Sequence, residues 1–292
     1  MKRPVFTGAA VAIITPMNAD GSINFDELGR IIDDQIANGT DAIVICGTTG
    51  ESPALDHNEH TDCIRYAVEK TAHRVPVIAG SGSNDTAYAI RLSREAQAAG
   101  ADGLLLVTPY YNKTSQAGLI AHYTAIADAV DIPCILYNVP SRTGVDIPVS
   151  VYQSLARIPN IAGVKEASGD ITKIARIRAQ CPEEFAVWSG NDNQAAAVMA
   201  LGGSGVISVV SNVLPDQTLS MARAALDGDF DTAADLQIRL LPLIEALFSE
   251  VNPIPVKAAM KLIGYDCGEC RLPLTPISQE NLKKLKAILL PS

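Results

Sequence analysis

Short apolar runs alternate with longer amphipathic segments over most of the chain. The runs are apolar at successive positions, so both faces of each strand that they predict should be covered, as in a parallel sheet. We expect eight such runs to form β-strands. They are Ala10–Ile14, Ala42–Cys46, Pro76–Ala79, Gly103–Thr108, Cys134–Val139, Ile161–Glu166, Phe185–Ser189 and Gly205–Val210.

The segments between these runs carry apolar residues at helical spacing, most clearly in Phe25–Asn38, Asn58–Ala72, Asp85–Ala99 and Ser115–Val130. Glycine or proline just before several strands marks the helix ends. About eight βα units fit a closed α/β barrel, the (β/α)8 or TIM barrel, better than an open doubly wound sheet. No G-x-G-x-x-G follows the first strand, which argues against dinucleotide binding.

After Val210 the pattern predicts helices only, at Leu214–Leu226, Phe230–Phe248, Val256–Ile263 and Gln279–Leu289. The first would be the last helix of the barrel. We therefore expect a barrel over residues 1–227 and a C-terminal helical extension over residues 228–292. The extension should pack on the barrel, because no linker composition separates the two.

Composition adds limits to this fold. The chain has 292 residues, 48% of them hydrophobic, which is enough for one large core. A formal charge of −9 argues against a nucleic-acid partner, although a locally positive pocket can still bind an anionic substrate. No apolar stretch is long enough to span a bilayer, and Met1–Pro4 does not begin a signal peptide. We expect a cytoplasmic protein without a membrane partner.

The cysteines and histidines do not form a metal-binding pattern. Cys267 and Cys270 have the two-residue gap of a redox or metal pair, but no second pair or nearby histidine accompanies them, and we assign them no role. His57 and His60 share one face near a helix start. A solvent-exposed or regulatory pair is favoured there over a zinc site, which needs more ligands. We therefore predict no metal.

Reactive groups in such a barrel lie at the carboxyl ends of the strands and in the loops that follow. The second strand leads into Gly47–Glu51, where two threonines between glycines either hold an anion such as a carboxylate or serve to form a turn and cap the next helix. Tyr110 and Tyr111 follow the fourth strand, as rim packing or proton donors. Tyr137 lies within the fifth strand. Arg142 follows it and either clamps a substrate carboxylate or pairs with an acidic neighbour.

The sixth strand is the most informative. Lys165 stands in the middle of its apolar run, where lysine is rare, and Glu166 points to the opposite face of the sheet. Desolvation lowers the pKa of such a lysine and makes the neutral amine available as a nucleophile; a buried ion pair is the alternative. The glycine-containing segments Ser189–Asp192 and Gly202–Gly205 are a weaker sign of a phosphate site.

Several longer motifs occur in order along nearly the whole chain: Phe6–Gly8, Ile14–Met17, Gly47–Ser52, Thr108–Asn112, Leu136–Gly144, Gly163–Ala167 and Asn252–Lys257. Together they resemble the dihydrodipicolinate synthase (4-hydroxy-tetrahydrodipicolinate synthase) family, within the pyruvate-dependent class I aldolases. The resemblance implies a Schiff-base lyase that condenses pyruvate with L-aspartate 4-semialdehyde to 4-hydroxy-tetrahydrodipicolinate, in lysine and diaminopimelate biosynthesis. It also implies a homotetramer built as a dimer of dimers, and no metal or cofactor, because the protonated imine supplies the electrophile.

The same resemblance implies roles for single residues. Lys165 matches the lysine that condenses with pyruvate, and Tyr137 matches the tyrosine that moves protons to and from the imine. Thr48 and Tyr111 match its relay partners, and in the family that second tyrosine comes from the adjoining subunit. The implied substrate-binding residues are Thr49 for the pyruvate carboxylate, Arg142 for the carboxylate of the semialdehyde, and Gly190 and Ile207 for the pyruvate pocket.

Arg142 separates this interpretation from its main alternative. Sialic acid lyases and keto-sugar acid aldolases share the lysine, tyrosine and threonine pattern but act on polyol aldehydes, whereas an arginine favours a carboxylate-bearing partner. Two alternatives come from other functional classes. One is a phosphosugar isomerase or epimerase without a covalent lysine, and the other is a non-catalytic sensor of 2-oxo acids or lysine.

The resemblance extends to the family's feedback site for L-lysine. Its counterparts are Ser52, Pro53, His57, His60, Asn84, Tyr88 and Tyr110. Pro53 replaces a small residue, and Tyr88 stands where a glutamate would receive the amino group of the inhibitor. A phenol loses most of that charge attraction, so we expect weak or altered inhibition by L-lysine.

Overall fold

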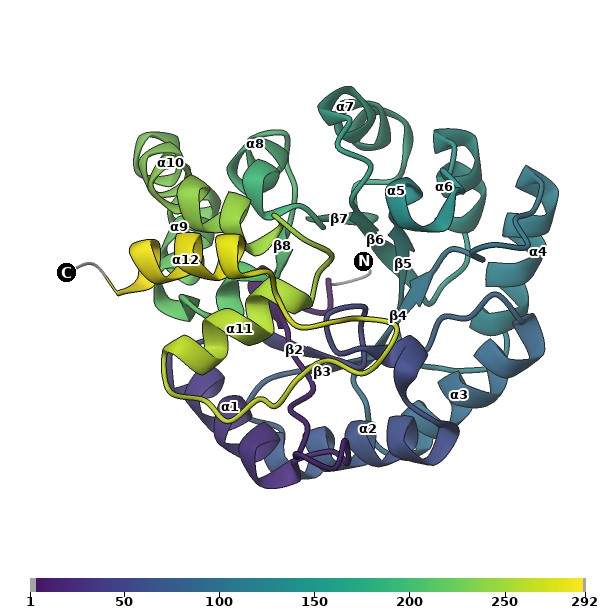
Figure 1. The fold of residues 1–292 in the computed structure, drawn as a ribbon. Coiled ribbons are helices and arrows are strands. Elements are labelled where there is room, and N and C mark those ends of the chain that lie inside the picture. Colours follow the sequence, from purple (N-terminus) through teal and green to yellow (C-terminus); the bar gives the residue numbers. More distant parts are fainter. Residues whose placement is uncertain (1–3, 291–292) are drawn as a thin grey trace.

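The computed structural model describes residues 4–290, and its eight strands form a closed parallel barrel (Figure 1). The charged start of the chain, residues 1–3, lies outside the described residues, as do residues 291–292. The strands are β1 (Gly8–Ala12), β2 (Ala42–Ile45), β3 (Val77–Gly80), β4 (Gly103–Val107), β5 (Cys134–Asn138), β6 (Ile161–Glu166), β7 (Ala186–Ser189) and β8 (Gly205–Ser208). The predicted TIM barrel is therefore confirmed.

The first strand begins and ends two residues earlier than the apolar run Ala10–Ile14 predicts. The reason lies in the closure of the barrel, where Gly8 pairs with Gly205 of β8. A Cβ atom added to Gly205 would lie 1.9 Å from the carbonyl oxygen of Gly8, so only glycine fits this contact. The glycines extend the strand beyond its apolar residues.

Helices surround the barrel, and α1 to α4 and α9 lie where the sequence predicts helices. The ring contains α1 (Phe25–Ala37), α2 (His57–Thr71), α3 (Thr86–Ala98), α4 (Gln116–Ala127), α5 (Pro140–Thr143), α6 (Val149–Leu155), α7 (Ile171–Gln180), α8 (Ala195–Ala200) and α9 (Pro215–Leu226). No helix was specified for the segments that form α6, α7 and α8. Helix α5 is a single turn in the predicted loop after β5. Short 3-10 turns follow three strands: η1 (Ser52–Ala54), η2 (Asp192–Gln194) and η3 (Val210–Asn212).

The amino end of the barrel interior is filled. Trp188 of β7 is fully buried, and its ring stacks on Phe6 with 5.2 Å between the centroids. Phe6 precedes β1, and its carbonyl oxygen accepts a hydrogen bond from Trp188 Nε1 at 3.3 Å. The strands add small or branched side chains such as those of Ala10, Val44 and Ile78 to the same interior cluster. A site inside the barrel can therefore open only toward the carboxyl ends of the strands.

The C-terminal extension consists of α10 (Phe230–Leu247), α11 (Ile254–Leu262) and α12 (Gln279–Leu289), which lie together beside α9 (Figure 1). Helix α10 packs on α8 and α9, and α12 packs on α10 and α11. Buried residues of the extension such as Leu243, Met260 and Leu285 belong to the same apolar cluster as Leu28 and Leu119 of the barrel helices. This shared core holds the extension in one position. No helix within residues 4–290 combines the length and apolar character needed to cross a membrane.

Candidate active site

Lys165 is the buried lysine that lacks an ion pair. Three lysines are buried within residues 4–290, and two of them are paired, Lys173 with Asp146 and Lys257 with Glu51. Lys165 is 6% exposed, and its Nζ lies 4.5 Å from the centroid of the Tyr137 ring. The geometry thus does not support the alternative of a structural ion pair for Lys165.

Burial lowers the pKa of Lys165 from 10.5 to about 8. The buried carboxylate of Asp192 opposes this shift, and the positive charge of Arg142 adds to it. At neutral pH an amine with this pKa is richer in the neutral form than an ordinary lysine by roughly 300-fold. Lys165 is therefore prepared for nucleophilic attack on a carbonyl carbon.

Adduct formation with a ketone should become faster as the pH rises through about 8, the pKa of Lys165, because only the neutral amine attacks. The measurement is the rate at which pyruvate and borohydride add mass to the protein across a pH series. Asp192→Asn removes a carboxylate that favours the ammonium form, so its midpoint should lie lower. A wild-type midpoint near the ordinary lysine value would contradict the prediction.

A cavity of about 570 Å³ lies beside Lys165 at the carboxyl ends of the strands. Most of the predicted catalytic and substrate-binding residues line it, namely Lys165, Tyr137, Thr48, Thr49, Arg142 and Gly190. Ile207 is buried in the barrel interior and does not line the cavity. Tyr111 also lies outside it, with a side chain that is 91% exposed and a left-handed backbone with φ of 68°.

Tyr137 is a buried phenol beside the amine. Its register on β5 places it directly opposite Lys165 on β6. Burial raises the pKa of Tyr137, while Arg142 and a side-chain hydrogen bond with Thr48 oppose the rise. The phenol is therefore protonated at neutral pH, and its bond with Thr48 gives the proton a path toward the loop after β2.

The loop after β2 does not use its threonines to cap a helix. Asp56 caps α2 through the backbone N–H of Glu59, and η1 begins without a side-chain cap. The Thr49 hydroxyl instead accepts a hydrogen bond from Asn252 Nδ2 at 2.9 Å. The segment forms a turn, in which the Glu51 N–H donates to the Thr48 carbonyl oxygen at 3.1 Å. The helix-capping interpretation of the two threonines is wrong, and both residues line the cavity.

Gly190 is required by close packing against the lysine. A Cβ atom at this position would lie 2.7 Å from the Ala167 Cβ and 3.2 Å from the Lys165 Cε. A larger residue would force Ala167 or the Lys165 side chain to shift. Gly190 follows β7, whereas Gly202–Gly205 leads into β8 at the opposite end of the barrel. The glycine-containing segments therefore do not form the phosphate site that the sequence weakly indicated.

Arg142 has no acidic partner within residues 4–290 that would make it a structural arginine. It lies in α5 with an exposed side chain, and its Nη2 donates to the Asn252 carbonyl oxygen at 3.2 Å. This single bond to a neutral group leaves the other guanidinium donors free. Arg142 can therefore bind a carboxylate at the mouth of the cavity.

Glu166 faces away from the barrel interior, as its alternation with Lys165 predicts. Its carboxylate accepts hydrogen bonds from Asn138 Nδ2 at 2.9 Å, the Tyr152 hydroxyl at 2.8 Å and the Ser168 N–H at 2.8 Å. Asn138 directly follows Tyr137, so these bonds fix β5 against β6 immediately behind the two reactive side chains.

Two residues near the amine were not identified as functional from the sequence. Asp192 is buried, and its carboxylate accepts hydrogen bonds from Ser208 Oγ at 2.5 Å and the Val209 N–H at 2.9 Å. Asn252 reaches the cavity from the C-terminal extension. Asp192 lies in a segment singled out as glycine-containing, and Asn252 lies in a motif of the family resemblance. Neither residue type suggested a specific chemistry at its position.

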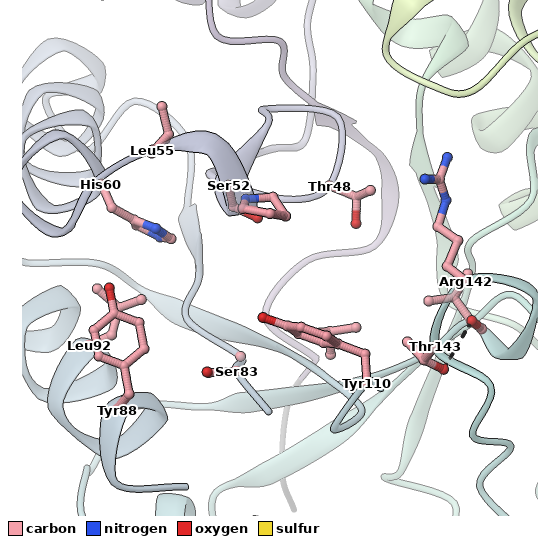
Figure 2. Close-up of a pocket in the computed structure, with 14 residues that line it drawn as sticks. Thr48, Ser52, Leu55, His60, Ser83, Tyr88, Leu92, Tyr110, Arg142 and Thr143 are labelled. Carbon is pink, nitrogen blue, oxygen red and sulfur yellow. Dashed lines mark hydrogen bonds between the residues drawn. The ribbon is translucent and has the colours of Figure 1, made fainter. Parts of the chain in front are cut away.

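A second cavity, of about 360 Å³, adjoins the first, and both are lined by Thr48, Val139 and Arg142. Figure 2 shows His60 and Tyr88 at one end, Arg142 at the other, and Tyr110 between them. Five of the residues predicted for the feedback site line this cavity: Ser52, Pro53, His60, Tyr88 and Tyr110. The other two support it from outside, because His57 Nδ1 lies 3.4 Å from the Tyr88 hydroxyl and Asn84 Nδ2 donates to the Tyr110 carbonyl oxygen.

The solvent-exposed pair suggested for His57 and His60 is wrong for His60. This residue is 6% exposed, and its Nε2 lies 2.7 Å from the Gly80 carbonyl oxygen. Burial lowers its pKa, so the ring is neutral. His60 lies one helical turn after His57, where α2 faces the barrel. A regulatory role for the two histidines stays a prediction.

Cys267 and Cys270 are both free, and burial raises the pKa of each thiol to about 12. Thiols with such a pKa are unreactive at neutral pH. Within residues 4–290, no three side chains of histidine, cysteine, aspartate or glutamate are grouped as a metal site would require.

Sequence comparison connects this geometry with known proteins. The model of the dihydrodipicolinate synthetase family matches residues 5–291. A 4-hydroxy-tetrahydrodipicolinate synthase of Thermoanaerobacter sp. (strain X514) is 52% identical over 287 residues, which cover 98% of this chain and 96% of that protein.

Solved structures agree with the sequence match. The dihydrodipicolinate synthase of Aquifex aeolicus superposes with a TM-score of 0.96 at 46% identity and 97% coverage of both chains. The Acinetobacter baumannii enzyme in complex with pyruvate superposes with a TM-score of 0.95 at 43% identity, also with 97% coverage of both chains. The Cyanidioschyzon merolae enzyme with lysine bound superposes with a TM-score of 0.96 at 38% identity, with 98% coverage of both chains. Together with the barrel and the buried lysine at its mouth, these matches show that the chain belongs to the dihydrodipicolinate synthetase family.

Proposed function

We propose that Lys165 forms a Schiff base with pyruvate and that the chain condenses this adduct with L-aspartate 4-semialdehyde. The chain is a lyase of the class I aldolase type, and its product is 4-hydroxy-tetrahydrodipicolinate, in lysine and diaminopimelate biosynthesis. The observation that carries the proposal is the unpaired, buried amine of Lys165 beside a cavity at the carboxyl ends of the strands.

The reaction needs no group beyond the two substrates and the side chains described. The neutral amine of Lys165 attacks C2 of pyruvate, and loss of water leaves an iminium. The iminium withdraws electrons, so C3 loses a proton and becomes the nucleophilic carbon of an enamine. C3 then attacks the aldehyde carbon, whose oxygen takes up a proton. The amino group of the second substrate finally attacks C2 and displaces Lys165, which closes the ring.

Each of these steps moves a proton, and Tyr137 is suited to carry it. Its phenol lies beside the amine and stays protonated until a basic intermediate forms. Thr48 extends the path through its hydrogen bond with Tyr137. We assign Tyr111 as the next member, supplied to the cavity by a neighbouring subunit, because its side chain is 91% exposed on its own chain.

Pyruvate trapping tests the central assignment. Wild-type protein treated with pyruvate and borohydride should gain the mass of one reduced adduct, on the peptide that contains Lys165. Absence of an adduct would exclude a Schiff-base lyase and favour an isomerase on the same fold. An adduct without turnover of aspartate semialdehyde would instead indicate a different aldehyde substrate or a non-catalytic sensor.

Arg142 should determine the choice of aldehyde. Arg142→Leu removes the charge that we assign to the carboxylate of aspartate semialdehyde, so the KM for this substrate should rise about 10- to 100-fold. Trapping of pyruvate should persist in the variant, because the lysine and its pocket are retained. Steady-state kinetics with each substrate varied in turn measure the effect. An unchanged KM for the semialdehyde would favour an aldolase for uncharged aldehydes.

We also propose that the second cavity binds L-lysine, and that it does so weakly. A related enzyme from Cyanidioschyzon merolae has been solved with lysine bound. Tyr88 offers a hydroxyl to the cavity, not a carboxylate, and this hydroxyl lies 3.4 Å from His57 Nδ1. An ammonium group loses most of its attraction at such a site.

Tyr88→Glu should strengthen inhibition by L-lysine, with the half-inhibitory concentration falling by about tenfold or more. A lysine titration of wild type and variant measures this change. Tyr88→Phe serves as the matched control, because it retains the ring without adding charge. L-lysine should inhibit this variant no better than it inhibits the wild type. Tight inhibition of the wild type would contradict the assignment of Tyr88.

We further propose a homotetramer built as a dimer of dimers in the cytoplasm. The exposed, left-handed Tyr111 supports the dimer, since it fits a side chain that enters a neighbouring cavity. Mass determination in solution tests the assembly. A fully active monomer would contradict it.

A further inference from the structure

The C-terminal extension contributes Asn252 to the wall of the active-site cavity. The residue lies between α10 and α11, is 5% exposed and adjoins Thr49 and Arg142. Its Nδ2 donates to Thr49 Oγ1 at 2.9 Å, and its carbonyl oxygen accepts from Arg142 Nη2 at 3.2 Å. One residue thus contacts both side chains that we assign to substrate carboxylates.

We propose that Asn252 is a positioning residue that orients the Thr49 hydroxyl toward the carboxylate of pyruvate. The proposal rests on the function proposed above, and on the binding of the pyruvate carboxylate that the family resemblance implies for Thr49. Because Thr49 Oγ1 accepts a hydrogen bond from the Asn252 amide, its own O–H proton is not used in that bond. Within residues 4–290 the Thr49 hydroxyl donates to no acceptor, so this proton remains available to an anion in the cavity.

The extension holds Asn252 rigidly against the loop after β2. Lys257 of α11 forms an ion pair with Glu51 at 2.8 Å, and both side chains are almost completely buried. The other Glu51 oxygen accepts the N–H of Arg271 at 2.8 Å. The loop is therefore tied to the extension at Glu51 as well as at Thr49. Two fixed points restrict the Thr49 side chain far more than one exposed hydrogen bond would.

Asn252→Ala should raise the KM for pyruvate about tenfold, the usual effect of losing one buried hydrogen bond. The kcat should change less, because saturating pyruvate overcomes weaker binding. The KM for aspartate semialdehyde should stay the same, since alanine keeps the carbonyl group that holds Arg142. Equal changes in both KM values, or none in that for pyruvate, would overturn the proposal.

A double-mutant cycle separates positioning from general damage. If Asn252 acts through Thr49, the variant Asn252→Ala with Thr49→Val should bind pyruvate no worse than Thr49→Val alone. Additive losses would overturn the proposal. Asn281→Ala is the matched control, because this asparagine also donates an amide hydrogen bond within the extension, to Glu250 Oε1 at 2.8 Å. It should leave the KM for pyruvate unchanged.

Asn252→Asp provides a test that keeps the shape of the side chain. Its carboxylate would accept a hydrogen bond from the Thr49 hydroxyl and repel pyruvate, so the KM for pyruvate should rise more than in Asn252→Ala. Wild-type affinity in this variant would overturn the proposal. Thermal melting checks that each variant is folded. A borohydride adduct in the wild type, together with a wild-type KM for pyruvate in Asn252→Ala, would contradict this inference alone. Absence of an adduct in the wild type would contradict the proposed function.

Discussion

Lys165→Met should lower kcat by at least about 10⁴-fold and abolish the borohydride adduct with pyruvate. Methionine has nearly the length of lysine and suits the buried, apolar surroundings of this position. The fold should therefore persist while the nucleophile is lost. Kinetic assay and intact mass, both at saturating pyruvate, measure the two effects.

Lys173→Met is the matched control for this substitution. Lys173 is as buried as Lys165 but forms an ion pair with Asp146 on the outside of the barrel. Its loss should lower stability, because Asp146 and Glu166 lose their cation. The adduct with pyruvate should still form. An adduct in Lys165→Met, or its absence only in Lys173→Met, would place the nucleophile elsewhere.

Tyr137→Phe should lower kcat by about 10²- to 10⁴-fold, the range for loss of a general acid–base group. The ring contact with the Lys165 amine, at 4.5 Å, does not need the hydroxyl, so phenylalanine keeps the packing and the nucleophile. The adduct should still form at long times, although each proton transfer becomes slower. Pre-steady-state trapping compared with overall turnover separates these two effects.

Thr48→Val is the companion variant, because it removes the hydrogen bond to Tyr137 and leaves the phenol in place. Its loss in kcat should be smaller than that of Tyr137→Phe. The double variant should be no slower than Tyr137→Phe alone, since Thr48 then has no phenol to serve. Independent, additive losses would show that the two hydroxyls do not form one path.

Strand periodicity predicted the barrel well because each strand is a continuous apolar run that parallel pairing covers on both faces. Prediction was poorer where side-chain pattern carries little information. The start of β1 depends on Gly8 meeting Gly205 across the closure of the barrel, a contact that no local pattern encodes. The single-turn helix α5 arises in a stretch that proline and glycine made look like a loop.

The reactive lysine could be predicted because a cation in an apolar strand contradicts its surroundings. Asn252 gave no such contradiction, since asparagine is ordinary between helices. Its importance comes from a contact with Thr49, which lies more than 200 residues away in the chain. The burial of His60 was not predicted, for a related reason. Helical spacing predicts a shared face with His57 but not how deeply each ring is buried.

The aromatic pair of Phe6 and Trp188 has a kinetic consequence. Because it closes the amino end of the barrel, substrates and product must pass through the opening at the carboxyl ends of the strands. The exposed Arg142 and the buried Lys165 both line the cavity at this opening. A semialdehyde held by Arg142 at this opening would block the path of a ketone to the Lys165 amine. Turnover should therefore follow a compulsory order, with pyruvate first, and excess semialdehyde should compete with pyruvate for entry.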